Sequence, residues 1–292
     1  MRYIEAVPSP AIRPYVECLW ALDGWTRGGA LDPVLPDGHP EIIVHSGDPF
    51  ASVAPSGVRT VQAPVLVAGQ MRHALALTAL GHAHVAGARL RPHGLKAFFG
   101  GSCEDLTDLV VDLASIDLQL ARHLLVDVAA RPTPMERMHA LDRALCRWAN
   151  GQRIDPLVGQ ACELATARRG LTRVSSLVRD AGLSARQFER RFGAQVGLSP
   201  KAFLRVVRFQ QVLKAMDGGG PTDWARLAVE HGFYDQPHFV NDFKAFTGLA
   251  PTEWNITDDS LTAVFSVGRG RDRLNRVDVG FFQDAHRSES LA

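Results

Sequence analysis

Cysteine is scarce in this chain of 292 residues, and the few cysteines are poorly placed for a disulfide or metal site. The four cysteines stand far apart, with no C-x-x-C pair, at Cys18, Cys103, Cys146 and Cys162. Disulfide frameworks and cysteine metal sites need paired or closely spaced cysteines. We therefore expect buried free thiols in a reducing compartment, which favours a cytoplasmic protein.

Long apolar runs and an excess of one charge are also lacking. The first twenty residues contain no apolar run of the kind found in signal peptides. No stretch reaches the roughly 18 apolar residues of a membrane span, so we expect no membrane partner. The formal net charge is +1, which by itself indicates no partner. The length allows about two domains of ~100–200 residues each.

Recognisable catalytic patterns are missing as well. The sequence shows no nucleophile–base constellation, phosphate-binding loop or paired-carboxylate motif, so we expect neither an enzyme nor a cofactor. His73, His82 and His84 suggest a metal site, since alternation along a strand would put His82 and His84 on one face. A metal site built on an H-x-H pair would use a glutamate shortly after the second histidine as a further ligand. That glutamate is absent, since residues 85–88 are Val, Ala, Gly and Ala. We therefore predict no metal site.

The chain changes character along its length and divides into four segments. Residues 1–112 are rich in Gly, Pro and short apolar runs, which predict strands and turns. Residues 113–150 have helical spacing and form a connector, and residues 151–255 stay helical with Gly and Pro breaks such as GGGP at 218–221. Residues 256–292 form a polar tail. The predicted fold class is α+β, a β-rich barrel or sandwich followed by an all-α domain.

The expected elements are as follows. Strands are predicted at 15–22, 41–47, 64–70, 73–80 and 84–90, with two strand-like stretches in the tail at 261–267 and 277–282. Helices are predicted at 93–99, 113–130 and 134–150. Turn chemistry occupies 23–33 and 46–57.

One pattern of thirteen residues occurs twice in the helical half. FERRFGAQVGLSP stands at 188–200 and FVNDFKAFTGLAP at 239–251. Each copy follows a short helical stretch that ends in Gly182 or Gly232, residues suited to the left-handed position that closes a helix. Two helices joined by a tight glycine turn form a helix-turn-helix unit. Two matched copies predict DNA binding, and a helical bundle with a duplicated hairpin is the alternative.

The second helix of each copy has its own start and stop signals. Ser184 and Gln187 predict a capping box, and Asp235 predicts an N-cap in the second copy. Phenylalanines four residues apart form the buried face, a glycine then ends the helix, and a proline follows where the first turn of a next helix accepts it. These residues are Phe188, Phe192, Gly197 and Pro200 in the first copy, and Phe239, Phe243, Phe246, Gly248 and Pro251 in the second.

A continuous helix is predicted between the copies at 199–216. Its length of roughly 27 Å is close to the ~34 Å between successive major-groove faces of DNA. Its buried side is expected to hold Phe203, Val206, Val207, Leu213 and Met216. Residues 151–255 also hold 14 Lys and Arg against 10 Asp and Glu, a mild basic excess that a solvated surface would also produce.

The stretch GFYDQPHFVNDFKAFTGLAP at 232–251 resembles the signature of AraC-type transcription regulators. The resemblance covers about 154–254. It implies two helix-turn-helix units joined by a linker helix, which bind adjacent major-groove segments of a double-stranded operator, usually to activate transcription. RNA polymerase and a second copy of the chain are further partners to consider. The N-terminal part is similar, more weakly, to cupin-like domains that sense a ligand or dimerise, through LPDGHPEIIVHSGDPF at 35–50 and GQ at 69–70.

Three residues on the first recognition helix fall at the base-reading positions of that family. Arg186, Glu189 and Arg190 share a face away from the phenylalanines. Arginine pairs two-pronged with guanine, and glutamate accepts a hydrogen bond from cytosine N4. A surface Arg–Glu–Arg ion-pair cluster is the alternative.

The second recognition helix departs from this pattern. Its corresponding residues are Pro237, Val240 and Asn241, of which only Asn241 can make a two-pronged contact, to adenine. Gln236 at the helix start is a further candidate. We expect this unit mainly to grip phosphates. The predicted backbone contacts of both units are Ser184, Arg191, His238 and Lys244.

The N-terminal domain offers four candidate effector contacts, Trp20, His39, Glu41 and Arg89, although each also fits a turn or core position. Three hypotheses stay open at this point. The first is a regulator that senses a small molecule, and the second is a regulator whose N-terminal domain only dimerises. The third is a cupin-like metalloenzyme fused to a DNA-binding module.

Overall fold

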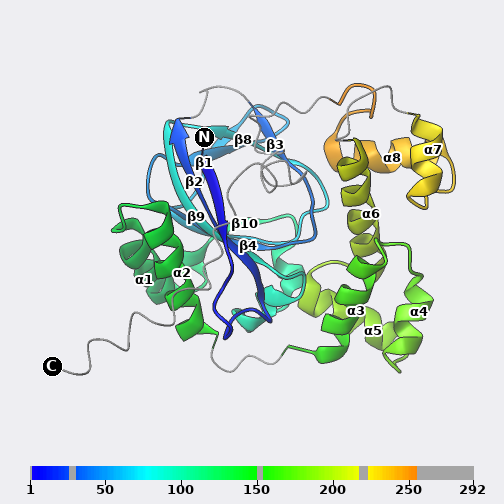
Figure 1. Ribbon diagram of the computed structural model, residues 1–292, viewed down its shortest axis with the longest axis horizontal. Helices are drawn as coiled ribbons and strands as arrows, with labels where there is room; N and C mark the ends of the chain where they lie inside the picture. The colour runs from blue at the N-terminus through cyan, green and yellow to red at the C-terminus, as the bar shows by residue number, and fades with distance from the viewer. Residues whose placement is uncertain (1, 26–30, 150–153, 217–222, 255–292) are drawn as a thin grey trace.

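The computed structural model describes residues 2–25, 31–149, 154–216 and 223–254. A β-rich N-terminal domain is followed by helices (Figure 1), which confirms the predicted α+β fold class. The predicted tail strands and the GGGP break lie outside the described residues. The strands are β1 (Arg2–Ala6), β2 (Val16–Trp25), β3 (Asp32–Val34), β4 (Glu41–His45), β5 (Phe50–Val53), β6 (Arg59–Val61), β7 (Val65–Ala68), β8 (Leu75–Ala79), β9 (His82–Leu90) and β10 (Val110–Asp112).

The strands form two antiparallel sheets. The larger sheet has the order β1-β2-β9-β4-β7-β10, and the smaller sheet has the order β3-β8-β5-β6. In the larger sheet, β9 lies between β2 and β4 and pairs with both. Side chains that point inward from the two sheets form a small apolar core. Trp20, Leu22 and Val85 come from the larger sheet and Phe50 comes from the smaller sheet. This interior also contains the cavity described below.

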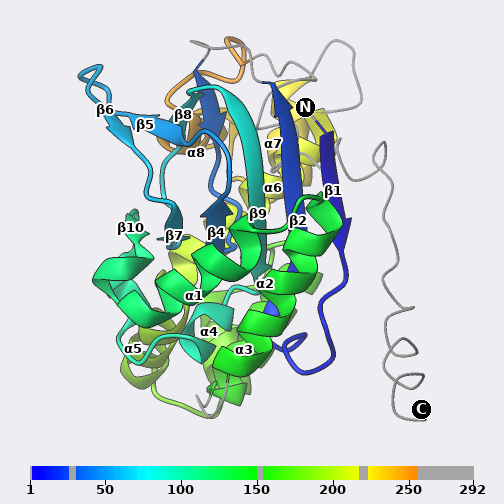
Figure 2. The same cartoon turned by 90° about the vertical axis from the view of Figure 1, so that its left-hand side faces the viewer.

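Two helices cover the other side of the larger sheet (Figure 2). Helix α1 spans Leu118–Ala129 and helix α2 spans Pro134–Trp148. A capping box of Thr133 and Glu136 starts α2, which explains the sharp boundary after the proline-rich link. Leu124 and Leu141 are fully buried in a shared core with strand residues such as Ile42. Amphipathic spacing in the connector therefore serves to close the β domain.

Several predicted elements differ in extent or type from the structure. The segment 46–57, predicted as turns, contains β5, because Phe50 and Ala51 are buried while the strand pairs with β6 and β8. The predicted turn 23–33 likewise contains the end of β2 and the start of β3. Strand β1 was not predicted, and neither were β6 and β10. The short helix expected at 93–99 is a 3-10 turn, η1 (Gly94–Ala97).

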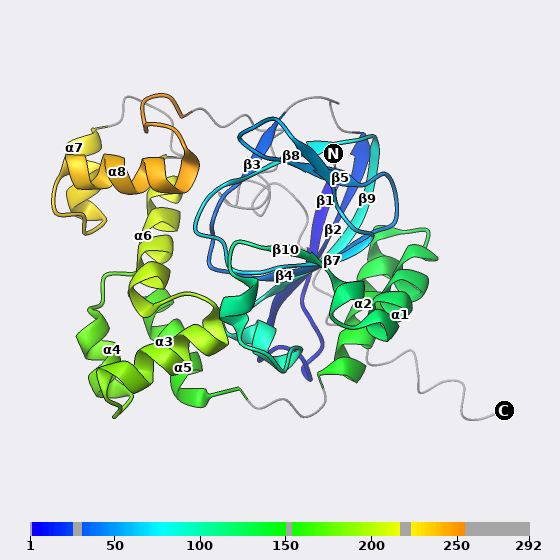
Figure 3. The same ribbon diagram turned by 180° about the vertical axis from the view of Figure 1, so that it is seen from behind.

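The helical half contains six α-helices within its described residues. They are α3 (Pro156–Ala167), α4 (Val174–Asp180), α5 (Ala185–Val196), α6 (Pro200–Met216), α7 (Trp224–Glu230) and α8 (Gln236–Thr247). Helices α4 and α5 form the first helix-turn-helix unit, and α7 and α8 form the second. The two units lie at opposite ends of α6 (Figure 3). The predicted linker helix is thus confirmed, with a length of about 26 Å for its 17 residues.

The linker helix places one phenylalanine in the core of each unit. The ring centroids of Phe203 and Phe192 are 5.8 Å apart, and those of Phe209 and Phe246 are 4.6 Å apart. Phe203 and Phe209 are each 1% exposed. Because aromatic burial contributes strongly to packing, α6 fixes the separation and orientation of the two units. Pro251 departs from the prediction, since it begins a short turn rather than a further helix.

Two further observations concern the cysteines and the length of the apolar helices. The four cysteines all lie within the described residues and form no disulfide, and Cys18, Cys103 and Cys162 are buried. Burial raises the pKa of the Cys103 thiol to about 12, so this thiol stays protonated and unreactive at neutral pH. No helix in the described part of the chain is long and apolar enough to cross a membrane.

Candidate nucleic-acid interface and ligand cavity

The turn and cap signals of both helix-turn-helix units form as predicted. Gly182 and Gly232 have φ angles of +64° and +74°. Ser184 and Gln187 form the predicted capping box at the start of α5, and the Asp235 carboxylate accepts from the backbone N–H of His238 at 2.8 Å. Each recognition helix therefore begins at a fixed residue, which sets which side chains face outward.

The predicted base-reading face of α5 is open to solvent. Arg186, Glu189 and Arg190 are exposed, while Phe188 and Phe192 on the opposite side are fully buried. Among the described residues, no salt bridge joins the three exposed side chains to one another. Base reading by this face stays a prediction, with which the exposure of both arginines is consistent.

The corresponding face of α8 is less polar. Gln236, Pro237 and Asn241 are exposed and Val240 is half-buried. Asp242 points inward, and its carboxylate accepts two hydrogen bonds from Arg205 of α6, at 3.1 Å from Nε and 2.7 Å from Nη2. A two-pronged arginine–carboxylate pair of this kind holds α8 rigidly against the linker helix.

The four residues predicted to contact DNA phosphates differ in their exposure and in their existing hydrogen bonds. Lys244 is exposed near the end of α8, and His238 is exposed with Nε2 4.0 Å from the Asp242 carboxylate. Ser184 is exposed but uses its side chain as the cap of α5. Arg191 donates from Nε to Asp155 at 2.5 Å, so a phosphate contact there would use its terminal amino groups.

One exposed residue near this interface was not predicted. Tyr234 is 90% exposed and directly precedes Asp235, the N-cap of α8, whereas its neighbour Phe233 is 5% exposed. Tyrosine is among the side chains that donate hydrogen bonds to DNA phosphates. The sequence signal was the pair of adjacent aromatic residues in the GFYD turn, because only one of two adjacent residues can face the core there.

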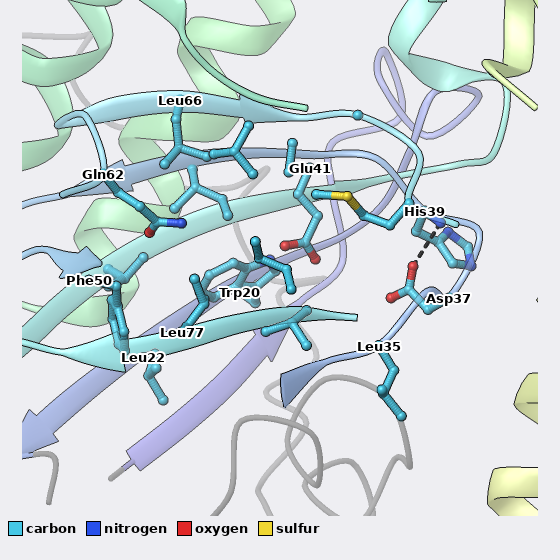
Figure 4. Close-up of a pocket in the computed structure, with 18 of the residues that line it drawn as sticks. Trp20, Leu22, Leu35, Asp37, His39, Glu41, Phe50, Gln62, Leu66 and Leu77 are labelled. Carbon is cyan, nitrogen blue, oxygen red and sulfur yellow. Dashed lines mark hydrogen bonds between the residues drawn. The ribbon is translucent and has the colours of Figure 1, made fainter. Parts of the chain in front are cut away.

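The β domain contains a cavity of about 90 Å³ between its two sheets (Figure 4). Its wall is mainly apolar, with Trp20, Leu66 and Leu77 among the residues that face it. Three of the four predicted effector residues lie in the wall, namely Trp20, His39 and Glu41. The fourth, Arg89, is 5% exposed and bonded to the carboxylate of Asp37, with Nη1 3.7 Å from Glu41.

Histidines in this wall are neutral at physiological pH. Burial and the nearby Arg89 charge lower the pKa of His39 to about 4, and its Nδ1 lies 2.8 Å from the carbonyl oxygen of Leu90. Burial also lowers the pKa of His45 to about 4. His45 was missed in the sequence, although strand alternation from Glu41 through Ile43 places it on the same face. Asp37 and Gln62 are further wall residues that lacked a local signal.

Of the three histidines considered for a metal site, two lie together and the third lies apart. His82 and His84 face one another, with ring centroids 4.3 Å apart, and His84 Nδ1 lies 3.4 Å from Asp23. His73 instead lies with Nδ1 2.9 Å from the carbonyl oxygen of Ala245. Within the described ranges, no group of three His, Cys, Asp or Glu residues is arranged to hold a metal ion.

The rim of the cavity also contacts the helical half. Leu35 and Pro36 line the cavity, and Leu35 is buried in the core of the helical half. The carbonyl oxygen of Pro36 accepts from Gln210 of α6 at 2.7 Å. On the next rim segment, the backbone N–H of Ala74 donates to the carbonyl oxygen of Phe246 in α8 at 2.9 Å. Two cavity-lining segments are thus bonded to the linker helix and to the second unit.

Two family descriptions match parts of the chain. Residues 177–255 match a "Helix-turn-helix domain", and residues 4–112 match a "Domain of unknown function (DUF6597)". The chain is 33% identical over 84 residues to the HTH-type transcriptional regulator MtrA of Neisseria gonorrhoeae, a match that covers 28% of this chain and 27% of that relative. The predicted resemblance to AraC-type regulators is confirmed, and it rests on the helical half.

The solved structures that match the chain include ToxT of Vibrio cholerae. A ToxT structure in a P21 crystal form matches with a TM-score of 0.42 and 10% identity, covering 80% of this chain and 97% of that one. ToxT of strain O395 bound to (E)-4-(8-methylnaphthalen-1-yl)but-3-enoic acid matches with a TM-score of 0.44 and 11% identity over the same shares. The AraC-like transcriptional activator CuxR matches with a TM-score of 0.23 and 14% identity, covering 68% and 73%.

Proposed function

We propose that this chain, whose helical half is of the AraC type, is a sequence-specific DNA-binding transcription regulator that senses a small molecule in its β domain. Its operator is double-stranded DNA, and RNA polymerase and a second copy of the chain are the partners expected of such a regulator. It acts as a regulator and not as an enzyme, and its place of action is the cytoplasm.

The observation that carries the DNA-binding proposal is the pair of capped recognition helices at the two ends of one rigid helix. The exposed face of α5 presents Arg186 and Arg190 without an internal ion-pair partner among the described residues. An α-helix fits the major groove of DNA, and arginine reads guanine there with two parallel hydrogen bonds. A merely structural helical bundle does not require two arginines held free on such a face.

The ligand-sensing proposal is supported by the cavity and by its contacts with the helices. A concave space with an apolar wall and a few polar groups is typical of a ligand site. Because Pro36 and Ala74 hold the rim of this space to α6 and α8, an occupant that displaces the rim changes how the second unit is held. A domain that only dimerises needs no such cavity, and the metalloenzyme hypothesis lacks a cluster of ligands in the described residues.

The domain boundaries follow from this proposal. We place the sensing domain at 1–112, the helical connector at 113–150 and the double helix-turn-helix domain at 151–255. The tail, 256–292, is a separate segment to which we assign no role.

Selection of bound sequences from randomised duplex DNA with the full chain, followed by fluorescence anisotropy at increasing salt, tests the DNA-binding proposal. We expect a defined preferred site and affinity that falls steeply with salt, because phosphate contacts release counterions. The double variant Arg186→Ala/Arg190→Ala should lose the preference. Arg122→Ala, which removes an exposed arginine on α1 in the other domain, is the matched control. Binding without sequence preference, or none at low salt, would overturn the proposal.

A further inference from the structure

The charged groups that line the cavity of the β domain are acidic. Asp37 and Glu41 contribute carboxylates to the wall, and neither lysine nor arginine belongs to the lining of the described cavity. Figure 4 shows the Glu41 carboxylate directed from β4 toward the Trp20 ring, with Asp37 on the same side of the cavity. A ligand in this space therefore meets negative charge and an aromatic face, and no cationic side chain of the wall.

The nearest positive charge, Arg89, is already engaged behind these carboxylates. Its side chain is 5% exposed and forms salt bridges with both Asp37 and Glu41. One guanidinium thus faces two carboxylates, and Glu5 is a further buried carboxylate, on β1 of the same sheet. The balance of charge around the cavity is negative by at least one unit. Because charges interact strongly where water is excluded, an anionic ligand would be repelled here.

The histidines of the wall do not change this balance. Burial is the main cause that lowers the pKa of both His39 and His45 to about 4, so both rings are uncharged at neutral pH. A neutral imidazole can still accept or donate a hydrogen bond. The wall therefore combines the carboxylates of Asp37 and Glu41 with an uncharged polar group at His45.

His45 is an independent sign that the cavity takes a polar ligand. The residue is 6% exposed, and neither of its ring nitrogens completes a well-aligned hydrogen bond, although Gln62 lies beside the ring. A buried polar group without a partner is costly, and it is normally satisfied by water or by a ligand. His45 and Glu41 lie on one face of β4, about 13 Å apart at ~3.3 Å per residue. Polar groups thus stand at two separate points of an otherwise apolar wall.

The size of the cavity limits the ligand. A volume of about 90 Å³ holds roughly six to nine water-sized groups at ~10–15 Å³ each. This corresponds to a small molecule with one ring or a short chain, and Trp20 provides the flat face for it. A positive charge over a tryptophan ring gains additional attraction, most of all where it is desolvated.

We infer that the cavity binds a small organic cation, an apolar body with one protonated amine that pairs with Glu41 beside the Trp20 ring. This inference rests on the proposed ligand-sensing function and specifies its ligand class. The ammonium group donates hydrogen bonds to the carboxylate, which compensates for its transfer out of water. The apolar body replaces water along the apolar wall.

Three probes of nearly equal shape test the inference, namely phenethylamine, 2-phenylethanol and phenylacetate. They carry a cationic, a neutral and an anionic group on the same ring and short chain. Calorimetric titration of the full chain at pH 7 should show phenethylamine binding at least tenfold tighter than 2-phenylethanol, with phenylacetate weakest. This ranking uses the unmodified protein and so does not depend on how any variant folds.

Glu41→Gln removes the charge and keeps the shape, and it should weaken phenethylamine binding by about tenfold while leaving 2-phenylethanol nearly unchanged. Glu17→Gln is the matched control, because it makes the same change at an exposed position on β2 outside the cavity. Tighter binding of phenylacetate or 2-phenylethanol would overturn the ligand class but leave ligand sensing in place. Binding of none of the three probes would overturn both the ligand class and the ligand-sensing proposal. The DNA-binding proposal is tested independently by the measurements described above.

Discussion

Equivalent glycines in the two repeats provide a test of how the first helix-turn-helix unit is docked on the β domain. Gly197 ends α5 with a φ angle of +89°, and Gly248 ends α8 with a φ angle of +79°. A Cβ atom at Gly197 would lie 2.9 Å from the carbonyl oxygen of Cys103, in the 3-10 turn η2 (Cys103–Leu106). A Cβ atom at Gly248 meets no described atom within 4 Å. The two positions share a backbone conformation and differ in their surroundings.

This difference predicts unequal costs for the same substitution. Alanine in the left-handed region costs roughly 1–2 kcal/mol, and this cost applies to both glycines. Gly197→Ala also forces a contact with a backbone carbonyl, for which overpacking typically costs ~1–3 kcal/mol more. The carbonyl of Gly197 moreover accepts a hydrogen bond from the Thr107 hydroxyl, and displacing it endangers this bond. We expect Gly197→Ala to lower the free energy of unfolding by about 2–5 kcal/mol and Gly248→Ala by about 1–2 kcal/mol.

Urea unfolding of the full chain, followed by circular dichroism, measures both costs. Asparagine separates their causes, because it tolerates the left-handed region far better than alanine but still carries a Cβ atom. Gly197→Asn should therefore remain destabilising, whereas Gly248→Asn should be close to neutral. Equal losses for the two alanine variants would mean that η2 does not press against the end of α5, and the docked arrangement would be refuted.

Further predictions concern the interface and the cavity. Arg190→Ala should weaken the binding free energy for the preferred DNA site by about 1–3 kcal/mol, and it should relax the sequence preference at one or two base pairs in selections from randomised DNA. A larger loss of binding free energy for Asn241→Ala would mean that the roles given to α5 and α8 are reversed. Lys244→Ala should weaken binding to all sequences alike and make the salt dependence shallower in anisotropy titrations, whereas a changed preferred sequence would exclude a phosphate contact. Because the pKa of His45 is lowered to about 4, the folded state binds fewer protons than the unfolded state between pH 6.5 and 4. The free energy of unfolding should therefore fall by up to about 3 kcal/mol on acidification through this window. Urea titrations at several pH values should show a smaller fall for His45→Phe, and an unchanged dependence of the free energy of unfolding on pH would contradict this reasoning.

The helical half was predictable because its signals are local. Gly182 and Gly197 both take the left-handed conformation, and the Ser184–Gln187 capping box forms as its spacing predicts. Each of these signals depends on residues within one or two helical turns. The phenylalanines four residues apart likewise identify the buried face without knowledge of what packs against it.

The β domain was less predictable because strands are defined by distant partners. The sequence of β5, FASV within a Pro- and Gly-containing stretch, carries turn chemistry, and only its pairing with β6 and β8 makes it a strand. The same holds for the cavity, where the Asp37–Arg89 salt bridge joins residues 52 positions apart. His45 is the exception, since alternation along β4 from Glu41 was enough to place it in the wall.

The duplicated unit separates what holds a helix-turn-helix together from what it does. Both copies keep the left-handed glycines and the buried phenylalanines, and both receive one phenylalanine from α6. Their outer faces differ, with Arg186, Glu189 and Arg190 on α5 and with Pro237, Val240 and Asn241 at the corresponding places on α8. The second unit is also the one whose end is bonded to the cavity rim through Ala74. We therefore expect the first unit to select the DNA sequence, and the second unit to set how firmly the protein holds it when the cavity is occupied or empty.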